Sequence, residues 1–213
     1  MDTISSKSKH LQFDDIMSMD RFPRMHLMNT ISGLKGAHLL GTTSHHGTPN
    51  LAVFSSVVHV GATPPHLGFI MRPLTVPRHT YHNIKAKGFF TLNSIHPSFF
   101  VKAHQSSANY PVEVSEFEEV GLTTLYTEAN PAPYVKESPI KIGLEYVEEH
   151  HVQANGTLFI VGKVIEILFP EAAMAPSGHI LHEQLETMTV SGLDSYYEAG
   201  EKHQLAYARP PKS

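Results

Sequence analysis

Residues 140–169 read IKIGLEYVEEHHVQANGTLFIVGKVIEILF, and this stretch decides the fold class. It contains two long runs rich in β-branched and aromatic residues, Ile140–Val152 and Thr157–Phe169. Between them lies Asn155-Gly156, a dipeptide typical of a tight hairpin turn. We therefore predict two long antiparallel strands here. The second is predicted to be a core strand because it carries five aliphatic residues: Val161, Val164, Ile165, Ile167 and Leu168.

Four shorter strands are predicted on the N-terminal side of this hairpin, separated by turns that contain Gly and Pro. They cover Ala37–Thr43, Asn50–Val60, His66–Met71 and Phe89–Ser94. At least six strands with a few helices between them are typical of a β-barrel with helical additions. We therefore predict a mainly β (α+β) chain with one domain over residues 13–213, preceded by a flexible tail of residues 1–12.

Helix signals are fewer and weaker than the strand signals. Arg78–Lys87 is the clearest, because Gly88 follows it at a typical helix end. Pro97–Ser107 begins with a helix-start proline, and Ser115-x-x-Glu118 has the form of a capping box. Phe13–Leu34 is irregular and is expected to hold no more than a turn or two of helix. A last helix is expected near His179–Met188.

The composition excludes several classes of protein. The chain has 213 residues, 16 Lys plus Arg, 20 Asp plus Glu, 16 His and no Cys. Without cysteine there is no disulfide, thiolate metal site, iron–sulfur cluster or thiol nucleophile. The formal charge of −4 disfavours a general nucleic-acid binder. No apolar run is long enough to cross a membrane, and the polar N-terminus lacks a signal-peptide pattern, so we expect a cytoplasmic protein without nucleic-acid or membrane partners.

The common catalytic motifs are missing, and a metal site receives little support. The chain has no glycine-rich dinucleotide or P-loop motif, no nucleophile elbow and no HExxH. His79 and His82 are three residues apart on the predicted helix, and His179 and His182 are spaced alike. Two imidazoles still need a third ligand and supporting contacts. We therefore expect no metal site, while a histidine-based metallohydrolase stays as a weaker alternative.

Two stretches combine residue types that suit a ligand. In Gly47–Ser56 (GTPNLAVFSS), strand alternation puts Asn50, Ala52, Phe54 and Ser56 on one face, which suits a flat ligand with a polar edge. An ordinary barrel strand explains the same pattern. Met71–Ile84 (MRPLTVPRHTYHNI) carries two arginines and a threonine near a helix start, which is typical of an anion site. A capped helix with two surface arginines is the alternative.

Taken together, these stretches resemble the flavin reductase-like family of FMN-binding split barrels. The resemblance rests on the order GTPNLAVFSS, TPPHLGFIMRP, RHTYHNI and FFTLNS, followed by APYVKESPIKIGLEYV, LFIVGKVIEI and GLDSYY. It covers residues 36–209. It implies a six-stranded antiparallel split β-barrel with helical additions, a homodimer, and non-covalently bound FMN near the dimer interface.

The resemblance also implies which residues lie near the flavin. The residues implied on the strand are Asn50, Ala52, Phe54 and Ser55; those implied after it are Arg72, Arg78, His79, Thr80 and Asn83. Arg78, Thr80 and Asn83 are implied near the ribityl phosphate. The sequence departs from the family pattern at two positions. Val53 replaces a proline found in many members, which affects the expected strand path. His79 replaces a frequent aspartate, which affects the expected phosphate contacts.

The implied function is FMN-dependent oxidoreduction, with NAD(P)H as a transient reductant and a flavin or another small molecule as electron acceptor. No side chain is predicted to be an essential acid or base, because the flavin itself accepts the hydride. An FMN-binding electron carrier without NAD(P)H reductase activity is the main alternative.

Overall fold

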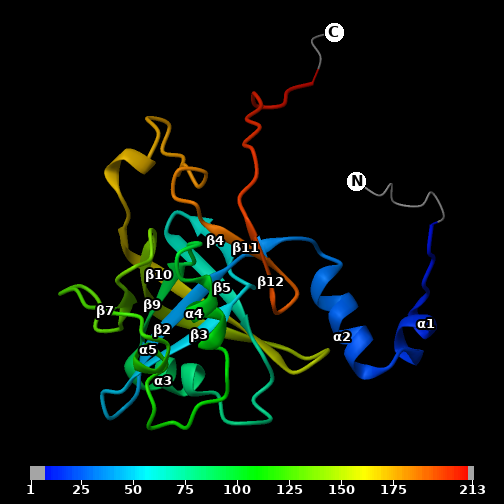
Figure 1. Cartoon of the computed structure of the whole chain (residues 1–213), viewed down its shortest axis with the longest axis horizontal. Helices are drawn as coiled ribbons and strands as arrows, with labels where there is room; N and C mark the ends of the chain where they lie inside the picture. Colours follow the sequence, from blue (N-terminus) through cyan, green and yellow to red (C-terminus); the bar gives the residue numbers. More distant parts are fainter. Residues whose placement is uncertain (1–7, 211–213) are drawn as a thin grey trace.

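The fold is built on one seven-stranded antiparallel sheet. The computed structural model describes residues 8–210 (Figure 1). The order of strands in the sheet is β3-β2-β6-β9-β10-β5-β4. Their bounds are β2 His38–Thr43, β3 Pro49–Phe54, β4 Val58–Ala62, β5 Pro65–Met71, β6 Phe89–Ser94, β9 Lys141–Val152 and β10 Thr157–Leu168. The mainly β prediction is confirmed, with a sheet that is curved but not closed and with seven strands rather than six.

The β9–β10 hairpin is the longest pairing in the sheet, as predicted. Its register runs from Thr157 opposite Val152 to Leu168 opposite Lys141, with two irregularities along β10. Gly156 has φ 73° in the turn, a conformation that glycine adopts without a steric penalty. β6 pairs with β9 on one side and β5 pairs with β10 on the other, so the hairpin lies in the middle of the sheet.

The predicted strand Asn50–Val60 is wrong as a single element. It forms two strands, β3 and β4, which lie at opposite edges of the sheet although only Ser55–Val57 separates them. The Ser56 hydroxyl helps to fix this crossing, because it accepts the amide hydrogen of Ile70 at 3.1 Å and lies 3.2 Å from the carbonyl oxygen of the same residue. The opening of the curved sheet therefore lies between its two edge strands, β3 and β4.

Two hydrophobic clusters cover the two faces of β3. The inner cluster packs Phe54 of β3 with Phe69, Phe90 and Leu144 inside the curved sheet. The outer cluster packs Leu51 of β3 beneath two short helices and a small second sheet. These elements are α4 Phe100–Gln105, α5 Glu116–Val120, and the sheet β1 Lys35–Gly36, β11 Met188–Ser191 and β12 Ser195–Glu198. A two-stranded ribbon, β7 Thr124–Leu125 and β8 Tyr134–Val135, and the short 3₁₀ turn Glu171–Ala173 lie outside these two sheets.

The N-terminal segment is more helical than its sequence indicates. It forms α1 Phe13–Ser18 and α2 Arg21–Thr30, and Pro23 fits because it lies in the first turn of α2. Neither helix contains a buried residue, and both stand away from the sheet (Figure 1). The predicted tail falls partly outside the described residues, at 1–7, and residues 8–12 form no helix or strand.

The helix predicted near His179–Met188 is wrong, and the helix predicted over Pro97–Ser107 is shorter than expected. Residues 182–186 form turns, and Glu186 has φ 46°, which breaks helical geometry. Met188 and Val190 then alternate into the outer cluster as residues of β11. Long-range pairing of β11 with β1 thus outweighs local helix propensity.

Among the 16 histidines, His38 at the start of β2 is distinguished by its environment. Its Nδ1 atom is buried without a hydrogen-bond partner. Burial lowers the pKa of His38 to about 4 because the charged ring would lose its hydration, and the ring of His182 adds a like charge. The ring is therefore neutral at pH 7.

We expect this histidine to make the fold sensitive to acid. Between about pH 6.5 and about pH 4 the unfolded chain binds a proton that His38 in the folded chain does not bind, so stability falls as the pH falls, by at most about 3 kcal/mol from this residue. Urea unfolding at about pH 7 and about pH 4.5 measures the loss. It should shrink in His38→Phe and persist in His151→Phe, whose histidine is exposed. Equal losses in all three proteins would assign the effect to other groups.

Candidate functional site

The outer edge of β3 offers a free backbone amide. β3 pairs with β2 on one side, and no strand of residues 8–210 pairs with its other side. The amide of Leu51 points to the unpaired side, because it donates to the Glu116 carboxylate at 2.9 Å. Amide directions alternate along a strand, so the amide of Val53 points the same way. Among residues 8–210 no acceptor is found for the Val53 amide. A ligand edge with an acceptor atom could pair with it.

Glu116 is a buried carboxylate at the end of this edge. It is the first residue of α5 and only 6% exposed. Burial raises the pKa of the Glu116 carboxyl, while its hydrogen bond with Leu51 and the nearby charge of His79 act in the opposite direction. The capping box predicted with Ser115 is wrong. Ser115 is the residue before the helix, but its hydroxyl makes no capping hydrogen bond.

The start of helix α3 (His79–Lys87) forms a second part of the site. Arg78, with extended dihedral angles, precedes the helix, and the first intrahelical bond runs from the amide of His82 to the carbonyl of Arg78. The amides of His79, Thr80 and Tyr81 therefore have no partner within the helix. The Nε atom of Arg78 is buried without a hydrogen-bond partner. An anion would satisfy both the Arg78 side chain and the helix amides.

Four buried polar side chains hold α3 against β2 and β3. The amide of Asn83 donates to the Thr42 hydroxyl at 3.1 Å, and the amide of Asn50 donates to the Thr80 hydroxyl at 3.5 Å. Thr42 and Asn50 are directly opposite each other in the β2–β3 pairing. Thr80 is the second residue of α3 rather than the residue before it, so its hydroxyl does not cap the helix. Its hydroxyl instead fixes the helix start beside the strand.

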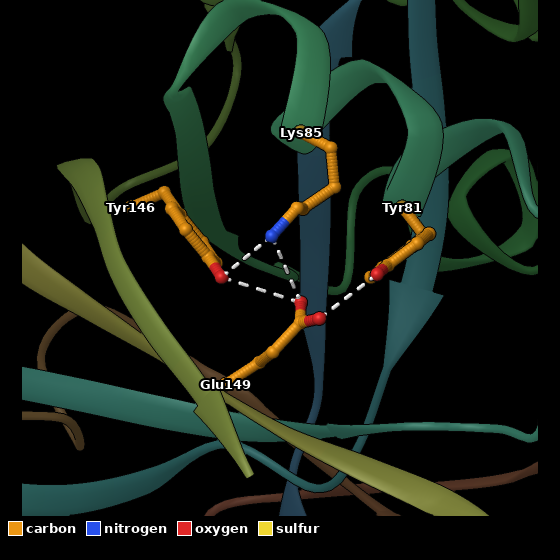
Figure 2. Close-up of polar contacts among 4 residues, drawn as sticks. All are labelled: Tyr81, Lys85, Tyr146 and Glu149. Carbon is orange, nitrogen blue, oxygen red and sulfur yellow. Dashed lines mark hydrogen bonds and ion pairs between the residues drawn. The ribbon is translucent and has the colours of Figure 1, made fainter. Parts of the chain in front are cut away.

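A further polar network attaches the same helix to β9 (Figure 2). The Tyr81 hydroxyl donates to the Glu149 carboxylate at 3.0 Å, and the Lys85 ammonium contacts the Tyr146 hydroxyl at 2.8 Å and Glu149 at 3.4 Å. The Lys85 ammonium also lies 4.5 Å from the centre of the Tyr146 ring. Hydrogen bonding to Tyr146 raises the pKa of Lys85, and burial together with Glu149 raises the pKa of Tyr81. The helix start is therefore held from two sides.

The structure brings together most of the residues predicted from the sequence. Arg78, His79, Thr80 and Asn83 lie on or before α3, and Asn50 reaches it from β3. The other residues predicted on or next to this strand, Ala52, Phe54 and Ser55, are only partly buried.

Two predicted residues are placed differently from the rest. Phe54 packs edge-on against Phe69 at 4.9 Å between ring centres, so it belongs to the inner core. Arg72 is exposed after β5, and within the part of the chain that the structure describes it makes no polar contact.

Neither Glu116 nor the four-residue network is indicated directly by the sequence. Glu116 lies inside the stretch Ser115–Glu118, which indicates only a helix start. Tyr81 and Lys85 are four residues apart on one helix face, a spacing that allows a shared partner. Their partners on β9 are more than 60 residues away in the chain. Only the fold brings them together.

Over residues 8–210, no group of three His, Asp or Glu side chains is arranged to hold a metal ion. The same residues include no helix with the length and apolarity needed to span a membrane.

The chain matches one protein family over most of its length. The profile of the flavin reductase like domain matches residues 32–185. Among solved structures, a candidate flavin reductase with a split barrel domain from Shewanella frigidimarina is 39% identical. That alignment covers 94% of this chain and 100% of the other, with a TM-score of 0.90.

More distant structures share the fold. Component B of nitrilotriacetate monooxygenase from Bacillus cereus is 20% identical to this chain. The alignment covers 94% of this chain and 100% of the other, with a TM-score of 0.82. The FMN-binding protein of Thermus thermophilus is 14% identical, with 94% and 99% covered and a TM-score of 0.71. A comparison with curated proteins finds no match.

Proposed function

The chain belongs to the flavin reductase-like domain family, and from this premise we propose that it is an oxidoreductase that holds FMN non-covalently and is reduced by NAD(P)H. When bound, FMN supplies the redox chemistry, because its ring system accepts a hydride and passes electrons on. The observation that carries the proposal is the unpartnered Nε of Arg78 beside the free amides at the start of α3.

The start of α3 suits the phosphate of FMN. A phosphate needs cationic and N–H donors, and Arg78 together with the first-turn amides provides both. His79 supplies a further N–H donor close to Glu116. The replacement of an acidic residue by His79 removes a negative charge from this region, which favours a dianion.

The outer edge of β3 suits the polar edge of a flavin ring. The outward amide of Val53 can donate to a ring carbonyl or nitrogen acceptor. The Val53 side chain packs into the outer cluster, and a valine in place of the usual proline adds this amide donor. The roles of these residues are to bind and orient the ring, since the flavin accepts the hydride without a protein acid or base.

A homodimer is part of the proposal. The helices α1 and α2 have no buried residue, yet they carry exposed apolar side chains such as Phe22, 64% exposed, and Met28, 55% exposed. Apolar helix faces of this kind are typical of interaction surfaces. Light scattering should give a particle of twice the chain mass of 23.6 kDa.

The visible spectrum of the purified protein tests cofactor binding. We expect a flavin absorption band at about 450 nm, either in the protein as it is isolated or after FMN is added and the excess is removed. Rapid bleaching of this band by NADH or NADPH in a stopped-flow experiment supports the reductase. Stable FMN binding without bleaching by either nucleotide supports the electron carrier instead. A protein that takes up no FMN at all overturns both.

A further inference from the structure

A single carboxylate occupies part of the outer edge of β3. The Oε2 atom of Glu116 accepts the amide hydrogen of Leu51 at 2.9 Å. The next amide on this side belongs to Val53, two residues along the strand, and it has no acceptor within the described part of the chain. A strand rises about 3.3 Å per residue, so the two amides are about 7 Å apart. The edge therefore presents one amide that is taken and one that is free.

The burial of Glu116 calls for a reason besides stability. The residue is 6% exposed, and burial raises the pKa of its carboxyl group. Glutamate is rarely buried so deeply without an ionic partner, because desolvation of the charge costs more than one hydrogen bond to a neutral amide returns. An uncharged side chain could satisfy the Leu51 amide at a lower cost.

The carboxylate has a fixed place because α5 is packed firmly against β3. Phe117 and Val120 of α5 lie in the outer cluster together with Leu51, and Phe117 is only 1% exposed. Gly121 ends the helix with φ 65°, and its amide donates to the carbonyl of Glu118. Packed side chains of this kind have little room to move. Glu116 therefore holds the Leu51 amide in one direction.

Leu51 lies between the two parts of the proposed flavin site. On one side of it, the Asn50 amide donates to the Thr80 hydroxyl at 3.5 Å, at the phosphate end. On the other side, Val53 carries the free amide proposed for the ring. Because the three residues belong to one extended strand, the direction of the Leu51 amide also sets that of the Val53 amide.

The same contact limits what can bind to this edge. An unpaired strand edge is a template for another strand, and a strand that pairs there uses the outward amides one after another. Glu116 holds the first of these amides, at Leu51, so a ladder of hydrogen bonds cannot run along β3. A small ligand needs only the second amide, at Val53.

We propose that Glu116 is a positioning residue, which holds the Leu51 amide so that the Val53 amide is fixed toward a flavin ring and kept free for it. Glu116 acts through the backbone of β3 and not by touching the ligand. The role of the Val53 amide rests on the proposed function, whereas the hydrogen bond to Leu51 does not.

Amide hydrogen exchange of the flavin-free protein, followed by NMR, tests the contact without a ligand. The Leu51 amide should exchange at least about tenfold faster in Glu116→Ala than in the wild type. Glu116→Gln should keep the slow exchange, because the glutamine oxygen reaches the same amide. Glu116→Asp should lose it, because its carboxylate is one methylene shorter. Glu119→Ala is the matched control, since Glu119 is exposed on the same helix.

Fluorescence titration and the visible spectrum of the FMN complexes test the positioning role. FMN should bind about five- to tenfold more weakly to Glu116→Ala and to Glu116→Asp, the effect of one hydrogen bond, and Glu116→Gln should recover most of the affinity. At saturating FMN the flavin band of the two weakened variants should move toward that of free FMN. A loss of stability alone would leave the band of the bound flavin unchanged.

The four variants separate position from charge. Recovery in Glu116→Asp but not in Glu116→Gln would assign the effect to the charge and overturn the proposal. Unchanged exchange of the Leu51 amide, or an unchanged flavin band, in Glu116→Ala and Glu116→Asp would overturn it as well. If Glu116→Ala does not fold, Glu116→Asp and Glu116→Gln give the same comparison. A protein that takes up no FMN but shows the expected exchange at Leu51 would overturn the proposed function and leave Glu116 assigned to the strand edge alone.

Discussion

Replacing Gly143 with alanine is expected to prevent stable folding of the chain. Gly143 lies in β9 with β6 on one side and β10 on the other. A methyl group there would overlap the Tyr134 hydroxyl and would lie 2.8 Å from Nδ2 of Asn130. The overlap with an immobile core residue makes a loss of more than about 3 kcal/mol the expected result. Thermal unfolding followed by circular dichroism measures it.

The neighbours of Gly143 explain why the structure cannot yield at this point. Tyr134 is fully buried, and its hydroxyl donates to the Glu166 carboxylate at 2.6 Å, which also accepts a hydrogen bond from Thr127. Burial and the hydrogen bond to Glu166 both raise the pKa of Tyr134, so the phenol stays protonated as a donor. Asn130 is fixed as well, because it donates to the carbonyl of Phe90 at 3.2 Å.

Two further variants separate this overlap from a general effect of alanine. Gly200→Ala is the matched control, because nothing lies within 4 Å of the added methyl group and the backbone there is not left-handed. It should melt like the wild type. Tyr134→Phe/Gly143→Ala removes the overlapping hydroxyl and should recover part of the loss. A Gly143→Ala protein that melts within about two degrees of wild type would show that β9 can shift to make room.

The central strands and the helix α3 could be predicted because their signals are local. β6 has the predicted bounds, the β9–β10 turn follows from Asn155-Gly156, and α3 ends at Gly88 as expected. The break after Phe54 could not be predicted, because residues 50–60 are uniformly β-rich, and β3 and β4 are assigned to opposite edges only by their long-range pairing with β2 and β5. The helix that was wrongly predicted near residue 180 has the same explanation. The strand β11 forms because it pairs with the distant strand β1, and local sequence does not show this pairing.

The candidate site divides in the same way between local and long-range signals. Arg78, Thr80 and Asn83 could be found because an anion-binding helix start has a recognisable order of residues. Glu116 could not be found, because its role depends on the amide of Leu51, which is 65 residues away in the chain. Sequence spacing alone also does not show which of Arg72 and Arg78 binds the phosphate. Burial distinguishes them, because only Arg78 has a guanidinium atom that is withdrawn from water and left without a partner.

Arg78→Ala is expected to weaken FMN binding roughly 100-fold, the loss expected when charge-assisted hydrogen bonds to a phosphate are removed. The flavin-free protein should not lose stability, because the substitution removes a buried Nε that has no partner in the absence of an anion. Fluorescence titration with FMN and thermal melts of the flavin-free protein measure the two effects. A purely structural arginine would give the opposite result, a lower melting temperature with unchanged affinity for FMN.

Arg72→Ala is the matched control for this prediction, since it removes the same charge from an exposed position. It should change FMN affinity by no more than a few-fold, because exposed charges are screened by solvent and salt. Arg78→Lys should fall between wild type and Arg78→Ala, because an ammonium keeps the charge but lacks the planar pair of donors. A larger loss in Arg72→Ala than in Arg78→Ala would move the phosphate away from the start of α3 and toward the end of β5. In that case the buried Nε of Arg78 would need a different anion, and the free amides of α3 would be the first place to search for it.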